Sequence, residues 1–205
     1  MCINYLSSLR GAVFDHSCEP NAEVVFDGIT LFVRANQDIP QRDINKDDKM
    51  LEVLIDGKEA EEQLKNIKEK QENLEKMVDQ HANLLSIEEE CRKEIEIQDK
   101  VLGKTNIYWI KSLNLAFNVC ISLKKWIDAI RFGNLLTEPY RFYYGLYSRH
   151  LGIHLFKIGK IQLFYGSPVD AEDVLKQAEN IMKVTYGEQH FLYQDLVKLL
   201  AEIQK

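Results

Sequence analysis

The chain has 205 residues, of which 45% are hydrophobic and 28% are charged, and its formal net charge at pH 7 is −6. A chain of this length can bury a core, while mild acidity without a Lys/Arg block argues against a nucleic-acid-binding surface, and the lack of an apolar run of about 18 residues argues against a membrane span. Ten glycines and four prolines are few for an all-β protein, so we expect a mainly α-helical body.

The only strands that the sequence predicts lie near the amino terminus. Two runs rich in β-branched and aromatic residues, 23–26 and 29–33, flank the dipeptide Asp27-Gly28. Asp-Gly favours a two-residue type I′ turn, because both central residues of that turn need positive φ. We therefore expect a β-hairpin with Asp27 and Gly28 at its turn.

A polar stretch at 38–49 contains Pro40 and separates the hairpin from a long region of helical period. In that region the charge run from Lys58 to Lys76 is expected to form a solvated face. The apolar stripe has spacings near three and four, with two polar members, so a packed helix pair is favoured over a coiled coil. The stripe consists of Leu64, Ile67, Gln71, Leu74, Val78, His81 and Leu85.

An internal repeat follows, because Gly103, Gly145 and Gly187 are each separated by 42 residues. Other positions keep this period: Leu113, Leu155 and Val197; Ala116, Ile158 and Leu200; Ala129 and Ala171. Each unit is interpreted as a helix pair, closed by a glycine in the left-handed conformation. We therefore expect tetratricopeptide-like stacked helix pairs.

Stacked pairs create a concave surface that can bind an extended peptide or a helix. An array that only supports a neighbouring domain is equally consistent with the sequence. His154 and His190 lack a second ligand at i+3 or i+4, so structural roles are expected for them. Cys91 and Cys120 are expected to be buried as small hydrophobic side chains.

Two sets of motifs carry a family resemblance. The segment 14–21, FDHSCEPN, precedes the predicted hairpin and resembles a motif of SET-domain protein-lysine methyltransferases. The segments 137–141 (TEPYR), 159–163 (GKIQL) and 184–190 (VTYGEQH) resemble the carboxyl-terminal helical domain of the SMYD family, whose members join SET and MYND domains to such an array. The resemblance implies a partial SET segment at 1–40, a linker at 41–58 and a helical-repeat domain at 59–205.

The resemblance also implies sites. Asp15 and His16 match the Asn-His pair that lines the S-adenosylmethionine pocket in the family, although an aspartate here replaces an amide donor with an acceptor. Cys18 matches a cysteine of the family's zinc site. The Cys-x-Cys-x-x-Cys run that supplies the other ligands is absent from the chain, so Cys18 is expected to be a residual ligand without bound zinc.

Other family features are also missing. After Ile39 the family continues to a strand ending in the tyrosine that orients the lysine amine, whereas here Pro40 leads directly into the linker. We therefore expect a truncated SET/MYND-type relative, an exon-skipped product or an incomplete gene model, with S-adenosylmethionine not bound and no catalytic residue assigned.

Three functions follow as hypotheses. The first is a non-catalytic protein that binds a protein or peptide on its array; the resemblance suggests histone tails or a chaperone, with no direct nucleic-acid or membrane partner. The second is an active S-adenosylmethionine-dependent histone or protein-lysine methyltransferase. A Cys-His hydrolase using Cys18 and His16 is disfavoured, because residues two apart on an extended segment stand too far apart to share a proton. The cysteines show no CxxC spacing and no signal-peptide-like run follows Met1, so we expect a reducing compartment, cytoplasmic and/or nuclear.

Overall fold

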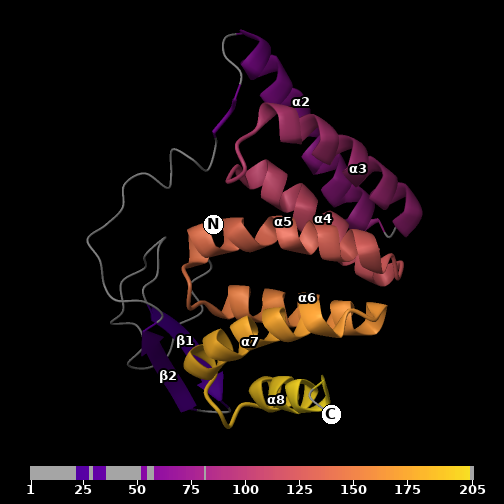
Figure 1. Ribbon diagram of the computed structural model, residues 1–205. Helices are drawn as coiled ribbons and strands as arrows, with labels where there is room; N and C mark the ends of the chain where they lie inside the picture. Colours follow the sequence, from indigo (N-terminus) through magenta and orange to yellow (C-terminus); the bar gives the residue numbers. More distant parts are fainter. Residues whose placement is uncertain (1–21, 28–29, 36–51, 55–57, 81, 204–205) are drawn as a thin grey trace.

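The structure is a computed structural model that describes residues 22–27, 30–35, 52–54, 58–80 and 82–203 (Figure 1). In 22–27 and 30–35 only the backbone is described. Seven helices occupy nearly all of the chain described after residue 57. In chain order these helices are α2 Lys58–Asp79, α3 Leu84–Val101, α4 Ile107–Ser122, α5 Trp126–Tyr144, α6 Arg149–Tyr165, α7 Pro168–Thr185 and α8 Phe191–Ile203.

The expected β-hairpin is present, with a different register at its turn. Strand β1 (Ala22–Asp27) pairs antiparallel with β2 (Thr30–Ala35), and the two strands form one two-stranded sheet. Asp27 pairs with Thr30, so it belongs to the ladder, and residues 28 and 29 connect the strands. The prediction that Asp27 is a central turn residue is therefore wrong by one position.

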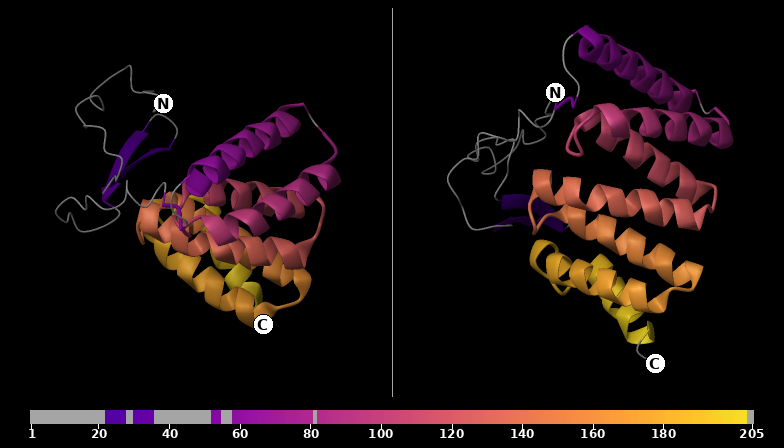
Figure 2. Two further views of the ribbon diagram at one scale, coloured as in Figure 1. Left: turned by 90° about the horizontal axis from the view of Figure 1, so that it is seen from above. Right: turned by 45° about the horizontal axis from the view of Figure 1, so that its top comes forward.

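The helices follow one another across the molecule in chain order, with α2 and α8 at opposite ends (Figure 2). Their starts repeat at the interval seen in the glycines. The first helices of successive units, α3, α5 and α7, begin at Leu84, Trp126 and Pro168. The second helices, α4, α6 and α8, begin at Ile107, Arg149 and Phe191. A period of 42 residues therefore governs both helices of each unit. This arrangement confirms the prediction of stacked helix pairs. None of the described helices combines the length and apolar character needed to cross a bilayer.

The repeated apolar positions are buried, with one exception. Leu113 and Leu155 are buried, but Val197 on α8 is 38% exposed. Val197 keeps the apolar period without being buried, since α8 is the last described helix of the array and no later described helix covers its outer side. The other repeated positions are buried: Ala116, Ile158 and Leu200, and Ala129 with Ala171.

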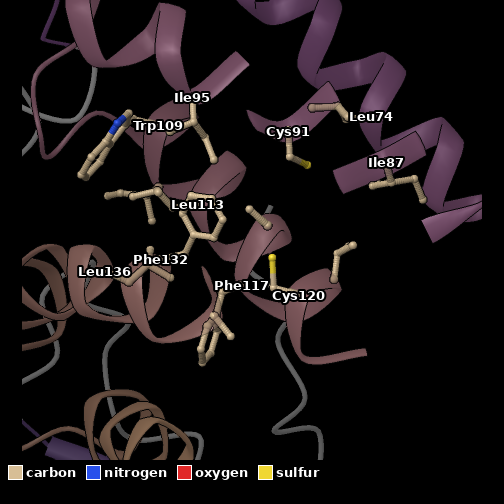
Figure 3. Packing of buried hydrophobic residues seen from close by; sticks show 14 of the residues in the cluster. Leu74, Ile87, Cys91, Ile95, Trp109, Leu113, Phe117, Cys120, Phe132 and Leu136 are labelled. Carbon is tan, nitrogen blue, oxygen red and sulfur yellow. The ribbon is translucent and has the colours of Figure 1, made fainter. Parts of the chain in front are cut away.

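Buried side chains form two adjoining clusters. The larger one is built from α2 to α5 with Ile158 and Ile161 of α6, and the smaller one from α6 to α8. In Figure 3 the labelled side chains Leu74, Cys91 and Leu113 come from three successive helices and point into the same interior. Cys91 and Cys120 are fully buried, which confirms their predicted role. Burial raises the pKa of the Cys91 thiol to about 12 and that of Cys120 to about 11.

The predicted apolar stripe spans two helices. Ile67, Gln71 and Leu74 are buried in α2 and face its neighbours, as expected of a packed helix pair. Val78 and Leu85 are 40% and 53% exposed, so their assignment to the buried stripe is wrong. The stripe ends because α2 stops at Asp79 and α3 begins at Leu84 with its own direction. Leu64 is partly buried against the larger cluster, while His81 lies outside the described residues.

The three periodic glycines do not share one role. Gly145 and Gly187 follow α5 and α7 with φ of 80° and 85°, values that favour glycine. Gly103 is not among the residues with positive φ, so the expectation of a left-handed cap there is wrong. Instead, a Cβ at Gly103 would lie 2.3 Å from Oε2 of Glu52. The ψ of Gly145, 172°, also lies outside the left-handed helical region that was expected there. A left-handed helix cap is present at Gly166, after α6, where φ is 92° and ψ is 27°.

The short segment 52–54 accounts for the crowding at Gly103. Val53 forms an antiparallel bridge with Leu102, directly after α3. The Leu54 amide donates to the Val101 carbonyl at 2.7 Å, and the Gly103 amide donates to the Glu52 carbonyl at 3.1 Å. The Glu52 carbonyl also accepts a hydrogen bond of 2.9 Å from Nδ2 of Asn106, the residue that caps α4. The amino-terminal side of the array is thereby fixed to the loop between α3 and α4.

Candidate functional site

A hollow with a volume of about 540 Å³ lies between α3 and α5, beside the array's core. We call it the α3–α5 groove. Helix α3 contributes residues that recur at intervals of three and four and so share one face. The groove is lined by Arg92, Ile95, Glu96, Asp99, Lys100, Lys104, Arg131, Phe132 and Leu135.

The apolar part of the groove comes from both helices. Ile95 and Phe132 are buried, whereas Leu135 is 43% exposed and accessible to a ligand. The guanidinium groups of Arg131 and Arg92 lie over the Phe132 ring, at 4.7 Å and 5.8 Å from its centroid. Cations held over an aromatic face in this way are attracted by the ring's quadrupole. The groove therefore combines an apolar lining with fixed positive charge.

A buried carboxylate holds one of these cations in place. Glu88 of α3 is only 4% exposed, and it accepts hydrogen bonds from Nε of Arg92 and from Nζ of Lys125, the latter at 2.8 Å. Nη2 of Arg92 also donates to Asp128 in the first turn of α5. Arg131 extends the same cluster, with its Nη2 at 3.8 Å from Oδ1 of Asp128. This Glu88 cluster joins α3 to the start of α5 and fixes the spacing across the groove.

The charges of the cluster reinforce one another. Burial alone would raise the pKa of Glu88, but hydrogen bonds from Lys125 and Arg92 hold that pKa below its ordinary value. The hydrogen bond to Asp128 raises the pKa of Arg92 against the effect of its partial burial, with a further contribution from Glu88. Glu88 and Arg92 are therefore both charged at neutral pH.

The remaining charged side chains of the groove are exposed to solvent. Lys104 pairs with Asp99, and its ammonium lies 4.9 Å from the centroid of the Trp109 ring. Lys100 and Glu96 are exposed and form no hydrogen bond or ion pair with the rest of the described chain. Four of the six charged residues that line the groove are cationic. The groove thus places an exposed apolar side chain beside a majority of cationic groups.

The residues predicted from the family motif are not part of this groove. Asp15, His16 and Cys18 lie outside the described residues, so their assignments to S-adenosylmethionine and to zinc stay predictions. Within the described residues no group of three His, Cys, Asp or Glu side chains is placed to hold a metal ion.

The two histidines have structural surroundings, as predicted. His154 is buried between the rings of Phe117 and Tyr140, and its Nε2 forms a 2.8 Å hydrogen bond with the Gly133 carbonyl. Burial lowers the pKa of His154 to about 4, so its ring is neutral at pH 7. Nδ1 of His190 accepts a hydrogen bond of 3.2 Å from the Leu192 amide at the start of α8.

Sequence reasoning did not single out the groove residues. The local signal existed, since Arg92, Glu96 and Lys100 recur every four residues and so lie on one helical face. What the sequence lacked was the partner face, because Arg131 and Phe132 lie almost a full repeat later in the chain. The 42-residue period could have paired them, since α3 and α5 are equivalent helices of successive units.

Comparisons with known proteins extend the structural findings. No protein-family model matches the chain. It is 29% identical over 222 residues to the histone-lysine N-methyltransferase SMYD3 of Homo sapiens, an alignment that covers 93% of this chain and 51% of that protein. It is 26% identical over 234 residues to the N-lysine methyltransferase SMYD2 of Homo sapiens, with coverages of 90% and 53%. The chain spans about half the length of the curated relatives it matches.

A solved structure agrees with the helical architecture. A crystal structure of nearly identical TPR-like repeats from Podosopora anserina superposes with a TM-score of 0.51 at 12% sequence identity, and the match covers 67% of this chain and 65% of that one. At this identity the likeness shows the fold alone. The sequence matches show that the chain is a homologue of the SMYD lysine methyltransferases, and the structural likeness shows that its helices form a TPR-like array.

Proposed function

We propose that this chain acts through its helical array as a protein-binding relative of the SMYD methyltransferases, and that it does not transfer methyl groups by itself. The observation that carries the proposal is the α3–α5 groove, in which an exposed apolar side chain, Leu135, lies among cations held by the Glu88 cluster. Such a groove suits a segment with an apolar anchor and a neighbouring carboxylate, because the anchor supplies affinity and the charges fix the orientation.

Binding can be measured by fluorescence polarisation with the full chain. The probes are fluorescein-labelled octapeptides with a central leucine flanked by aspartates, lysines or serines. We expect the aspartate-flanked peptide to bind about tenfold more tightly than the lysine-flanked one, and replacement of its leucine by serine to weaken binding by a similar factor. Equal binding of all three peptides would refute the groove as a selective site.

Two substitutions locate the binding. Lys100→Glu reverses an exposed cation of the groove, and Leu135→Ser removes part of its apolar lining, so both should weaken the aspartate-flanked peptide about tenfold. Lys198→Glu is the matched control, because Lys198 is an exposed lysine on α8 outside the groove. An equal loss with Lys198→Glu would show that only the overall charge of the protein matters.

The second candidate function is methyl transfer by this chain, and the homology to lysine methyltransferases supports it. The missing tyrosine strand after Ile39 argues against it. Incubation with labelled S-adenosylmethionine and histone is expected to give no product above a control without protein. Turnover that disappears in the His16→Ala variant would overturn the proposal of a non-catalytic chain.

A further inference from the structure

A second, smaller pocket lies between α2 and α3, on the other side of α3 from the Glu88 cluster. Its volume is about 280 Å³, below the roughly 300 to 1,000 Å³ of sites for drug-sized ligands, so a single side chain suits it better than a whole small molecule. The pocket is lined by Gln63, Asn66, Ile67, Glu69, Lys70, Asn73, Glu94 and Ile97.

Glu94 is the unusual member of this α2–α3 pocket. Its side chain is only 5% exposed, yet its carboxylate accepts no hydrogen bond from the described part of the chain. Its ion pair with Nζ of Lys70 spans 3.9 Å, which is too long for a hydrogen bond. The oxygens of Glu94 are not among the fully buried polar atoms without a partner in the described chain, so they face the opening of the pocket. Burial of the side chain is the main cause of the raised pKa of Glu94.

The other lining groups complement a cationic side chain with an aliphatic stem. Ile67 and Ile97 provide apolar contact for the stem, because long cationic side chains lay their methylenes along apolar surface. Side-chain oxygens of Gln63, Asn66 and Asn73 can accept further hydrogen bonds.

Lys70 shows that an ammonium group is attracted to this position. Its own side chain remains 54% exposed, so it neutralises Glu94 incompletely and can be displaced without leaving the solvent. A lysine or arginine of a partner that enters the pocket could approach Glu94 more closely and supply the missing hydrogen bond.

We propose that the α2–α3 pocket receives the side chain of a lysine or arginine from a bound protein segment, with Glu94 as the carboxylate that pairs with it. The proposal shares with the proposed function the idea that the array binds protein segments. It concerns a different pair of helices and the opposite ligand charge. The pocket therefore defines a second site on the array, selective for cationic side chains.

The test uses blocked pentapeptides, Gly-Ser-Lys-Ser-Gly and its norleucine analogue, titrated into the full chain and followed by amide NMR shifts of α2 and α3. Norleucine keeps the stem and lacks the ammonium. We expect the lysine peptide to bind about tenfold more tightly than the norleucine peptide. A third peptide with arginine shows which of the two cations the pocket prefers, and both preferences agree with the proposal.

Two variants of equal charge separate the pocket from the acidity of the whole chain. Glu94→Gln should weaken the lysine peptide about tenfold, whereas Glu69→Gln, which removes a 62% exposed carboxylate of the same pocket, should change binding less than about twofold. Equal effects of the two substitutions would overturn the proposal. Both variants are checked by thermal unfolding, so that a folding defect is not read as lost binding.

Lys70→Met gives an independent readout. It removes the internal competitor while keeping a flexible apolar side chain, so the lysine peptide should bind more tightly than to the unmodified chain. Unchanged or weaker binding would mean that Lys70 does not occupy the ligand's place, and would also overturn the proposal. None of these outcomes depends on the aspartate-flanked peptides, so failure here leaves the α3–α5 groove untouched.

Discussion

Two glutamates on α3 are buried to the same extent, yet their surroundings act on them in opposite directions. Glu88 and Glu94 are each 4% exposed. Glu88 has Arg92 one turn later and Lys125 from the start of α5, and its pKa is lowered although burial alone would raise it. Glu94 has Glu90 one turn earlier and only the distant pair with Lys70, and its pKa is raised by burial.

The difference teaches that the donors around a buried charge decide its effect, not the depth of burial. A carboxylate that receives two charged donors recovers its lost hydration and can stabilise the fold. A carboxylate without donors weakens the fold unless a ligand supplies them. The Glu88 side of α3 is therefore interpreted as structural and the Glu94 side as receptive.

The largest expected effect comes from breaking the Glu88 cluster. Glu88→Ala should lower the free energy of unfolding by about 2 to 3 kcal/mol at pH 7, since Arg92 and Lys125 lose their buried partner. Urea unfolding followed by circular dichroism measures this loss. Glu89→Ala is the control, because Glu89 is 68% exposed and pairs only with Lys93, so it should cost less than about 0.5 kcal/mol. Similar losses in the two variants would contradict the structural role of Glu88.

The opposite sign is expected at Glu94. Glu94→Gln removes a buried charge that lacks hydrogen-bond donors while keeping the shape of the side chain, so it should raise the free energy of unfolding by roughly 1 kcal/mol at pH 7. The same urea titration provides the measurement. A loss of stability as large as that of Glu88→Ala would show that the Glu94 carboxylate is already satisfied in the free protein.

The pH dependence of the two substitutions should separate at the ordinary carboxyl pKa of 4.5. The raised pKa of Glu94 means that its cost is fully present above that pKa and disappears as the pH falls toward 4.5, so the gain in Glu94→Gln should vanish there. The lowered pKa of Glu88 means that its contribution is fully present above 4.5 and is lost only at lower pH. Unfolding curves between pH 7 and pH 4 test whether the gain in Glu94→Gln disappears at a higher pH than the contribution of Glu88.

The smallest effect is expected for one donor of the Glu88 cluster. Lys125→Met should cost about 0.5 kcal/mol, because Lys125 is 38% exposed and Arg92 still donates to the carboxylate. A loss equal to that of Glu88→Ala would mean that Lys125 alone satisfies Glu88. The measurement is again the free energy of unfolding in urea, made beside the other variants at pH 7.

Much of the fold could be predicted from the sequence because the repeat is regular. The interval between Gly103, Gly145 and Gly187 equals the interval between equivalent helix starts, so the number and order of helix pairs followed from it. The boundaries of the helices were harder to predict than their number. The apolar stripe continues in phase from Leu74 to Leu85 across a break, and only the capping residue Asn83, whose side chain accepts from the Leu85 amide at 2.9 Å, marks the new helix.

The candidate sites could be predicted only in part, because the 42-residue period pairs α3 with α5 but the contacts within each site join residues that are distant in the sequence. Arg92 of α3 donates to Asp128 of α5, 36 residues later, and Glu94 of α3 pairs with Lys70 of the preceding helix, α2. In the sequence the glutamates of α3 resemble an ordinary solvated face, and nothing local distinguishes Glu88 and Glu94 from exposed Glu89. Only the packing of neighbouring helices reveals which charges are buried and which of them have donors.

The bridge between Val53 and Leu102 gives the array a mechanical property. Hydrogen bonds from residues 52–54 to Val101, Gly103 and Asn106 tie the chain to the loop after α3 before α2 begins. A force that pulls on the chain before residue 52 therefore reaches the middle of the first helix pairs and bypasses the end of α2. Helix α2, which follows the attachment, can therefore stay packed while the loop between α3 and α4 carries the tension.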